Sequence, residues 1–314
     1  MGRLILVPQY PTKLRYQEWW WEEFPKQFAK FFSKVIVLDG NGSEGMKAPG
    51  SNFAPAAQSV LFEMEQIKQY LSLKLEKDDI LLLNDLSFPG FFSTVLFHKR
   101  PSKCFAICHA TSKNKYDYFV EMRSVKYPIE KSTARLFDKI FVATKYHADK
   151  LNWSNLAIQA FPLPPFKGAQ LDKRYDIVSV SRPGKQKRNH QLETQLQYDL
   201  HKHIVTPIVT TWREYYNFLA KSRILLITAK EETYGYQVID AIANNCIPIA
   251  PNALSYPELL SKDYLYNTYN ELKEIIHTVV HNGLPIPKLL VQDSAQMFYK
   301  NIVLEITKHE KIHT

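Results

Sequence analysis

The stretch ILLITAKEETYGYQVIDAIANNCIPIA, residues 224–250, decides the fold. Its first apolar run predicts a buried strand over Arg223–Thr228, which ends in a polar loop. Gly235 permits the turn from that loop into a helix over Tyr236–Asn244, and a second apolar run, Ile247–Ala250, follows directly. A strand, a helix and a strand at this spacing are typical of a βαβ unit in a parallel sheet.

The same alternation runs through both halves of the chain. In the first half, the predicted strands are Leu4–Pro8, Val35–Leu38, Ile80–Asn84, Cys104–Cys108 and Lys139–Ala143, and the predicted helices are Tyr16–Ser33, Ala56–Leu75, Pro89–His98 and Tyr146–Leu151. In the second half, the further strands are Tyr175–Val180 and His203–Val209, and the further helices are His190–His201, Trp212–Ala220, Asn270–Val280 and Asp293–His309. This order predicts the α/β class with two Rossmann-like domains.

The densest proline cluster, Pro162-Leu163-Pro164-Pro165, marks the predicted boundary between the domains. We expect one domain over residues 1–163 and a second over 164–314, with the C-terminal helix packing back on the first. The stretch 40–55 is rich in Gly, Ser, Asn and Pro, which predicts a mobile loop.

Composition excludes several classes of protein. Of 314 residues 45% are hydrophobic, which suits a folded core, and 40 Lys and Arg against 31 Asp and Glu give a net charge of +9. Three irregularly spaced cysteines, 104, 108 and 246, fit neither a disulfide scaffold nor a zinc site. The first residues read as a strand rather than a signal peptide, and no apolar run reaches the ~18 residues of a spanning helix. We therefore expect a cytoplasmic protein.

The loop before the predicted helix at Tyr236 carries the most informative chemistry. A helix start favours an anion, so the backbone amides of Tyr234, Gly235 and Tyr236 are predicted to hold a phosphate. Glu232 and Asp240 flank that position, and a carboxylate accepts hydrogen bonds from hydroxyl groups. A phosphate with hydroxyls on both sides describes a nucleotide sugar. Taken singly, such carboxylates are more often a loop charge and part of a solvated helix face than ligands of a sugar.

This segment resembles the donor-site motif of GT-B glycosyltransferases, especially the retaining family-4 type. That motif is Glu, any residue, Phe, Gly, and a second Glu eight positions after the first; here Tyr234 and Gly235 follow Glu232, and Asp240 takes the second position. The resemblance implies that Glu232 contacts the transferred sugar and that Asp240 holds the ribose. It extends to Asn245, which replaces a Gly at the helix end, and to the pair Pro257-Glu258.

Two further elements fit the same family. Arg182 and Lys187 follow the strand Tyr175–Val180, and in the family an Arg and a Lys at this spacing clamp the donor diphosphate. His109 ends another strand, where the family has a histidine that contacts the donor sugar. The loop Pro8–Leu14 departs from the pattern because it lacks the usual glycine pair. The resemblance thus implies two domains facing across a cleft, a nucleotide-sugar donor with UDP-glucose as the default, and a retaining hexosyl transfer without a metal or other cofactor.

Other chemistries find little support. The chain has no GxGxxG after a strand, no Walker loop, no GxSxG and no HExxH. Asp85, at a strand end, fits the base of an inverting mechanism or a cap on the next helix. A protein that binds a nucleotide sugar without turnover is the alternative from another class.

A basic stretch points to the acceptor. Residues 98–150 carry 12 Lys and Arg against 5 Asp and Glu, with aromatic residues interleaved, a composition that suits a polyanion or an ordinary solvated surface. The predicted acceptor contacts are Lys113, Lys115, Tyr116 and Arg123. The layout resembles phage enzymes that glycosylate hydroxymethylated pyrimidines in DNA, so DNA is the favoured partner; Trp19–Trp21 or the 40–55 loop would fill the gap left by an extruded base.

A lipid-linked or cell-surface glycan is the alternative acceptor, with peripheral membrane contact through Tyr16–Phe32. Trp20, Phe24, Phe28 and Phe31 or Phe32 share one face of that predicted helix. The same stripe also fits a core helix. The sequence fixes neither the sugar nor the oligomeric state.

Overall fold

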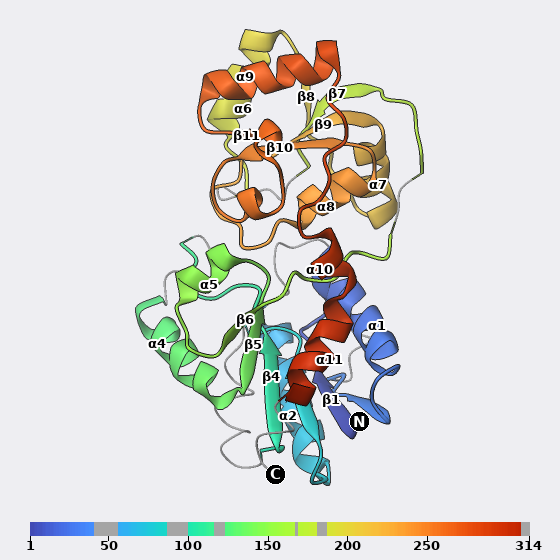
Figure 1. Ribbon diagram of the computed structural model, residues 1–314, viewed down its shortest axis with the longest axis vertical. Coiled ribbons are helices and arrows are strands. Elements are labelled where there is room, and N and C mark those ends of the chain that lie inside the picture. The colour runs from blue at the N-terminus through green and yellow to red at the C-terminus, as the bar shows by residue number, and fades with distance from the viewer. Residues whose placement is uncertain (41–55, 87–99, 116–122, 167–168, 181–186, 309–314) are drawn as a thin grey trace. The chain divides into compact units, whose positions relative to one another are not determined.

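The computed structural model describes residues 1–40, 56–86, 100–115, 123–166, 169–180 and 187–308 (Figure 1). The chain forms two compact units. Unit 1 contains Met1–Ala143, His147–Pro162 and Met297–Thr314, and unit 2 contains Thr144–Tyr146 and Leu163–Gln296. The predicted boundary between two domains at residues 163 and 164 stays a prediction.

Unit 1 is built on a parallel six-stranded sheet of order β2-β1-β3-β4-β5-β6. The strands are β1 (Arg3–Val7), β2 (Lys34–Val37), β3 (Ile80–Leu83), β4 (Lys103–Ile107), β5 (Lys139–Val142) and β6 (Leu156–Ile158). The central strands read as continuous apolar runs because both faces of a parallel sheet are covered. Thus Leu4, Ile5 and Leu6 of β1 are fully buried, in register with β3 from Leu4 opposite Ile80 to Val7 opposite Leu83.

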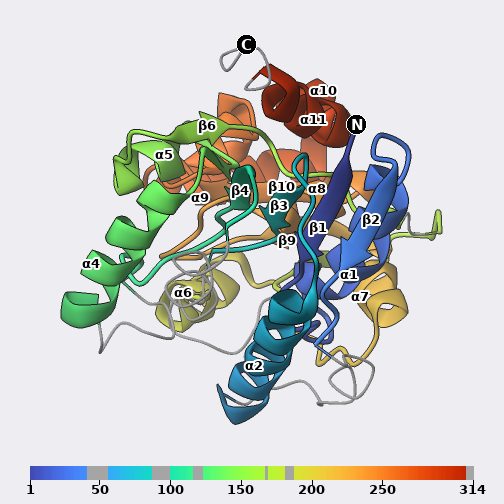
Figure 2. The same cartoon turned by 90° about the horizontal axis from the view of Figure 1, so that it is seen from below.

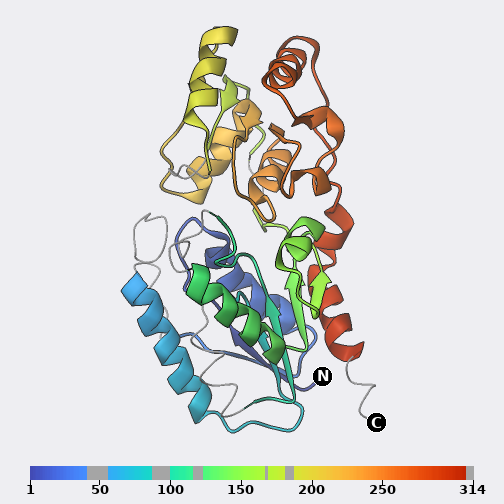
Figure 3. The same ribbon diagram turned by 90° about the vertical axis from the view of Figure 1, so that its left-hand side faces the viewer.

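Helices cover both faces of this sheet, and α2 and α11 lie on opposite sides of it (Figures 2 and 3). The helices are α1 (Tyr16–Phe28), α2 (Ala56–Ser72), α4 (Arg123–Thr133), α5 (Lys145–Leu151), whose first two residues group with unit 2, and α11 (Phe298–Lys308), with the short 3₁₀ turn η3 (Ala134–Leu136) after α4. The sequence analysis missed α4, whose interior Pro128 reads as a helix breaker.

The aromatic stripe of α1 lies in the core of unit 1. Trp20, Phe24 and Phe28 are at most 1% exposed, and Phe32, just after the helix, is 5% exposed. The Phe24 ring lies 5.6 Å from Phe298 of α11, and the Phe28 ring lies 5.2 Å from Tyr299. The reading of this stripe as a membrane-docking face is therefore wrong, while membrane contact through another surface stays a prediction. Trp19 is 4% exposed and belongs to the same core.

Unit 2 is built on a parallel five-stranded sheet of order β11-β10-β9-β7-β8. Its strands are β7 (Tyr175–Val178), β8 (Ile204–Val205), β9 (Ser222–Leu226), β10 (Ile247–Pro251) and β11 (Leu265–Tyr266). Its helices are α6 (His190–Leu200), α7 (Trp212–Ala220), α8 (Tyr236–Ala243), α9 (Tyr269–His277) and α10 (Gln292–Gln296), with 3₁₀ turns η4 (Tyr256–Glu258) and η5 (Lys262–Tyr264) and the π-helical turn η6 (Thr278–Asn282). The α/β prediction with two parallel sheets is confirmed.

The boundaries differ from the prediction at a few elements. The strand expected over His203–Val209 is only Ile204–Val205, and the predicted C-terminal helix is broken around Met297 into α10 and α11. The short strand β11 was not predicted. The helix expected over Pro89–His98 and the loop 41–55 lie outside the described residues.

The three cysteines are free and buried. Burial raises the pKa of the Cys104 and Cys246 thiols to about 12, so both stay protonated at neutral pH. Among the described helices, none combines the length and the apolarity needed to cross a bilayer.

The contact between α1 and α11 predicts a large effect of truncating Phe24. Phe24→Ala should lower the free energy of unfolding by about 3–5 kcal/mol, because it opens a cavity between two helices that are distant in sequence. Urea denaturation followed by circular dichroism measures the loss. Tyr198→Ala is the control, since Tyr198 is 78% exposed and should change the stability by less than about 0.5 kcal/mol. Equal effects of the two substitutions would contradict the packing.

Candidate functional site

A sharp turn joins β9 to α8, and Gly235 makes it possible. Gly235 precedes the first residue of α8 with φ +106°, a left-handed conformation that favours glycine. A Cβ atom added there would lie 2.9 Å from Cδ1 of Leu259. The backbone amide of Val238 donates to the carbonyl of Gly235 at 2.9 Å, which closes the first turn of the helix.

Side chains from other elements hold the loop before Gly235. The Thr144 hydroxyl donates to the carbonyl of Thr233 at 2.8 Å, and the Ser255 hydroxyl donates to the carbonyl of Tyr234 at 2.9 Å. Thr144, Ser255 and Tyr234 are fully buried. Two consecutive carbonyl groups are thereby fixed, so the loop has a defined conformation when it reaches α8. Neither hydroxyl residue could be predicted from the sequence, because their partners are far away in the chain.

Glu258, which was singled out in the sequence as part of the pair Pro257-Glu258, contacts the backbone at the start of α5. Its carboxylate accepts hydrogen bonds from the backbone amides of Lys145 and Tyr146, both at 2.7 Å. These are the first residues of α5, whose N-terminus favours a negative charge. Glu258 therefore helps to hold residues 144–146 beside the loop that Thr144 supports.

Lys187 and Glu232 form an ion pair within this part of unit 2. The ammonium group of Lys187 donates to Oε2 of Glu232 at 2.9 Å and to the carbonyl of Glu231 at 3.2 Å. Oε1 of Glu232 accepts from the amide of Thr233 at 3.0 Å and from that of Tyr234 at 3.4 Å. The two side chains are 19% and 13% exposed, so the pair is accessible from solvent but largely sheltered. The structure thus brings together Lys187, Glu232 and the amide of Tyr234, which is one of the three amides predicted to hold a phosphate.

The remaining residues of the predicted donor motif lie around this pair. The Tyr236 ring meets the Tyr234 ring edge to face at 5.0 Å. Gln237, in the first turn of α8, donates from Nε2 to the carbonyl of Val180 at 2.8 Å. Val180 and Lys187 are the last and first described residues on either side of 181–186, and both contact residues 232–240. Arg182 itself lies outside the described residues.

A buried carboxylate, Glu193, ties together the elements that carry Lys187. Glu193 is 3% exposed, and its Oε1 accepts from the hydroxyl of Ser179 at 3.1 Å and from that of Thr228 at 2.8 Å. Its other oxygen takes a hydrogen bond from Nε of Arg188 at 3.1 Å and pairs with Nη2 of the same guanidinium group. The Thr228 hydroxyl in turn accepts from the amide of Asn189 at 2.8 Å. Glu193 therefore fixes the residue next to Lys187 to the ends of β7 and β9.

Asp240 faces the core of unit 2 rather than Glu232. It is 6% exposed, and its carboxylate accepts from the hydroxyls of Tyr215 at 3.0 Å and Tyr216 at 3.4 Å, both on α7. Burial raises the pKa of Asp240 to about 7, although both hydroxyl hydrogen bonds act in the opposite direction. Binding a ribose would require Asp240 to exchange these tyrosine hydroxyls for those of the sugar.

In unit 1, His109 lies in an aromatic and carboxylate environment. Its ring stacks on Tyr16 with centroids 4.1 Å apart and on Phe161 at 5.5 Å. Its backbone amide donates to Oδ1 of Asp85 at 3.1 Å, and the Tyr16 hydroxyl donates to Oδ2 at 2.5 Å. Asp85, 5% exposed, therefore holds Tyr16 and His109 in place. The helix that Asp85 was expected to cap, predicted over Pro89–His98, lies outside the described residues.

Of the four residues predicted to contact the acceptor, the structure describes the side chains of two, and one of these makes contacts within the fold. Lys113 lies 5.3 Å from the centre of the Tyr127 ring and donates to the carbonyl of Lys150. Lys115 is exposed. Tyr116 and the side chain of Arg123 lie outside the described residues. In the same basic stretch, Lys126 pairs with the buried Glu130 at 2.7 Å, which removes its charge from the surface.

Metal ligands do not gather in the part of the chain that the structure describes. No group of three or more His, Cys, Asp or Glu side chains there has the arrangement to hold an ion. Positive potential beside the predicted phosphate position comes, within the described residues, from the Lys187 ammonium group and from the partial charge at the N-terminus of α8.

Solved structures with the same architecture are glycosyltransferases. HepE from Anabaena, in complex with UDP-glucose, superposes with a TM-score of 0.68 at 12% identity over 98% of each chain. Sucrose-phosphate synthase from Thermosynechococcus elongatus gives 0.66 at 12% identity over 99% of this chain and 98% of its own. TarM from S. aureus gives 0.54 at 16% identity over 77% of this chain and 56% of TarM. The two parallel sheets and these likenesses define the GT-B fold.

Sequence likeness covers a smaller part of the chain. No family model matches it. A tRNA-queuosine alpha-mannosyltransferase from Drosophila melanogaster is 35% identical over 85 residues, which are 27% of this chain and 22% of the Drosophila protein. The matched part thus spans about a fifth of that relative's length.

The network around Glu193 predicts a large cost for its removal. Glu193→Ala should lower the free energy of unfolding by about 3–5 kcal/mol, because it leaves the Arg188 guanidinium sheltered without its partner. Asp176→Asn is the matched control in the same unit: Asp176 pairs with Lys202 at 2.5 Å and with Arg223 at 3.4 Å, and all three side chains are at least 27% exposed, so we expect about 0–1 kcal/mol. Urea unfolding of both variants measures the difference, and similar losses would contradict the role of the network.

The raised pKa of Asp240 predicts a pH dependence with a defined sign. The folded chain holds this proton up to about pH 7, whereas the unfolded carboxyl loses it near 3.8, so the free energy of unfolding falls as pH rises through that window. Asp240→Asn keeps an acceptor for the tyrosine hydroxyls and removes the titration. Its stability relative to the wild type should therefore rise between pH 4 and 7, by an amount on the order of a few kcal/mol. Urea unfolding at pH 5 and pH 8 tests this; a constant difference would show that Asp240 does not titrate in this range.

Proposed function

We propose that this protein is a glycosyltransferase that moves a hexose from a nucleoside diphosphate donor, with UDP-glucose as the first candidate, to a hydroxyl acceptor. The observation that carries the proposal is the contact of Lys187 with Glu232 beside the N-terminus of α8 in a GT-B fold. The named complexes of HepE with UDP-glucose and of TarM with UDP support a uridine nucleotide as donor.

The proposed roles follow from charge and position. The leaving diphosphate gains negative charge as the glycosidic bond breaks, and the Lys187 ammonium group and the amides of Tyr234, Gly235 and Tyr236 stabilise that charge. Lys187 is held 2.9 Å from Glu232 in the structure, so it is positioned to bridge the carboxylate and a phosphate oxygen. Glu232 then orients hydroxyls of the transferred sugar. Arg182 as the second cation, Asp240 at the ribose and His109 at the donor sugar stay predictions.

We further propose retention of the anomeric configuration and transfer without a metal ion. Both rest on the resemblance of residues 232–240 to the family-4 motif. The NMR coupling constant of the product's anomeric proton tests the first, and turnover in EDTA tests the second. An inverted product would instead support Asp85 as the base, and loss of turnover in EDTA would contradict metal independence.

The acceptor that we propose is a nucleic acid. The net charge of +9 and the named substrate of the Drosophila relative, a tRNA nucleoside, support this class. Hydroxymethylated pyrimidine in DNA is the acceptor predicted from the sequence, and a modified tRNA nucleoside is the one that the relative favours. A lipid-linked or cell-surface glycan and binding of a nucleotide sugar without turnover remain alternative outcomes of the experiments below.

Glu232→Gln should reduce transfer by at least about a hundredfold, because it removes the negative charge that holds Lys187 and faces the sugar, while keeping the shape of the side chain. Release of UDP from UDP-glucose in the presence of acceptor measures the rate. Glu231→Gln is the matched control: it changes the adjacent carboxylate, whereas Lys187 contacts only the backbone carbonyl of Glu231. Near-normal turnover of Glu232→Gln would remove Glu232 from the site.

Mass spectrometry of digested nucleosides identifies the acceptor. The protein is incubated with a panel of nucleotide sugars and with hydroxymethylpyrimidine DNA or queuosine-containing tRNA. We expect a nucleoside heavier by one hexose in one of the two pools, and none with Glu232→Gln. UDP release without modification of either pool would contradict the nucleic-acid acceptor and direct the search to glycans.

A further inference from the structure

Two histidine side chains lie together at the end of α9 in unit 2. His277 is the last residue of α9, and His281 belongs to the π-helical turn η6 that follows it. The centroids of the two rings are 4.4 Å apart, and the ring planes are tilted by 39°. Both residues are exposed. Figure 1 shows α9 well separated from α8, so the pair lies outside the candidate donor site.

The turn that carries His281 has an unusual backbone. The amide of Gly283 donates to the carbonyl of Thr278 at 3.0 Å, a hydrogen bond that spans five residues instead of the four of an α-helix. Turns of this kind are rare in proteins and occur frequently at functional sites. The rare backbone geometry therefore coincides with the paired imidazole rings.

The separation of the two rings suits a shared metal ion. A ring nitrogen binds Zn²⁺ at about 2.0–2.1 Å, so two imidazoles on one tetrahedral ion have ring centres about 5 Å apart. The observed 4.4 Å is close to this separation, and exposed side chains can adjust by rotation. Imidazole nitrogen is a ligand of Cu²⁺, Ni²⁺ and Zn²⁺, whereas Mg²⁺ and Ca²⁺ take oxygen ligands.

The charges on α9 also favour a cation at this position. Lys273 lies one turn before His277, but its ammonium group is directed back along the helix. It lies 5.0 Å from the centre of the Tyr269 ring and 3.9 Å from the carboxylate of Asp199. Glu274, three residues before His277, is exposed, and its carboxylate adds negative potential on the same side of the helix.

We propose that His277 and His281 together bind one divalent transition-metal ion, Cu²⁺, Ni²⁺ or Zn²⁺, through one nitrogen of each ring. Two protein ligands leave the other positions of the ion to water, so this site differs from the groups of three or more ligands that the described residues lack. The ion joins the end of α9 to η6. Because this arrangement exists only in the folded chain, the bound ion stabilises the fold.

Titration of the full chain, without an affinity tag, with NiCl₂ tests the site. Paramagnetic Ni²⁺ broadens the ring-proton NMR signals of the histidines that bind it, and His277→Gln and His281→Gln assign the two signals. We expect both signals to broaden at the same Ni²⁺ concentration. When either histidine is replaced by Gln, the other should require at least about a tenfold higher concentration, because the second ring no longer binds within the same molecule. MgCl₂ should leave both signals unchanged.

Two control variants address the other histidines of the chain. The double substitution His201→Asn and His203→Asn changes two exposed histidines of unit 2 that are two residues apart. His309→Gln interrupts a second pair with the same spacing, His309 and His313, which lies outside the described residues. Both variants should leave the response of His277 and His281 to Ni²⁺ unchanged.

Stability provides a second measurement of the same site. Saturating ZnCl₂ should raise the thermal unfolding midpoint of the wild type by more than that of His281→Gln, because only the wild type holds the ion with both rings. The proposal would be overturned if His277 responded to Ni²⁺ at the same concentration in the wild type and in a folded His281→Gln variant. An equal shift of the midpoint by Zn²⁺ in the two proteins would also overturn it.

Discussion

The geometry of unit 2 depends on one buried carboxylate. A parallel sheet brings the ends of its strands to one edge, but it does not fix the loops that leave them. Glu193 does so by accepting hydrogen bonds from Ser179, directly after β7, from Thr228, two residues after β9, and from Arg188. Because Arg188 is next to Lys187, this internal ion pair limits where the Lys187 ammonium group can reach. The ammonium group of this otherwise flexible lysine is thereby held at a defined position.

The fold could be predicted from the sequence because its signals are local. The apolar runs of β1, β3, β4 and β9 and the glycine before α8 each determine their own element. The failures occurred where tertiary contacts override local preference. The helix α4 tolerates Pro128, and β8 keeps only two residues of a longer apolar run.

At the candidate site, too, local sequence signals allowed a prediction, whereas contacts between distant residues did not. The contact between Lys187 and Glu232 agrees with a motif whose spacing is visible in the sequence. Thr144, Ser255 and Glu193 carry no such signal, because a hydroxyl or a carboxylate is defined as a support only by the distant atom that it contacts. Asp240 has the motif position, yet its side chain is one methylene shorter than the expected Glu, and its oxygens are engaged by two tyrosines of α7.

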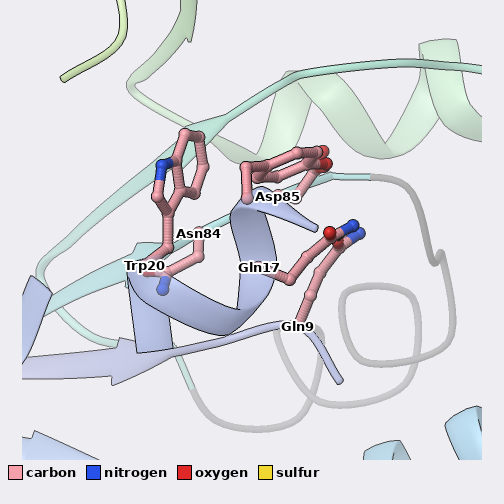
Figure 4. A pocket seen from close by; sticks show the side chains of 6 residues that line it. Gln9, Gln17, Trp20, Asn84 and Asp85 are labelled. Carbon is pink, nitrogen blue, oxygen red and sulfur yellow. Dashed lines mark hydrogen bonds between the residues drawn. The ribbon is translucent and has the colours of Figure 1, made fainter. Parts of the chain in front are cut away.

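The two units offer ligands opposite chemistry. In unit 2, a lysine and a helix N-terminus gather positive potential, which suits a diphosphate. In unit 1, the residues that follow β1 and β3 and the first turns of α1 carry one carboxylate, three carboxamides and a phenol, and none of these six side chains is a lysine or an arginine (Figure 4).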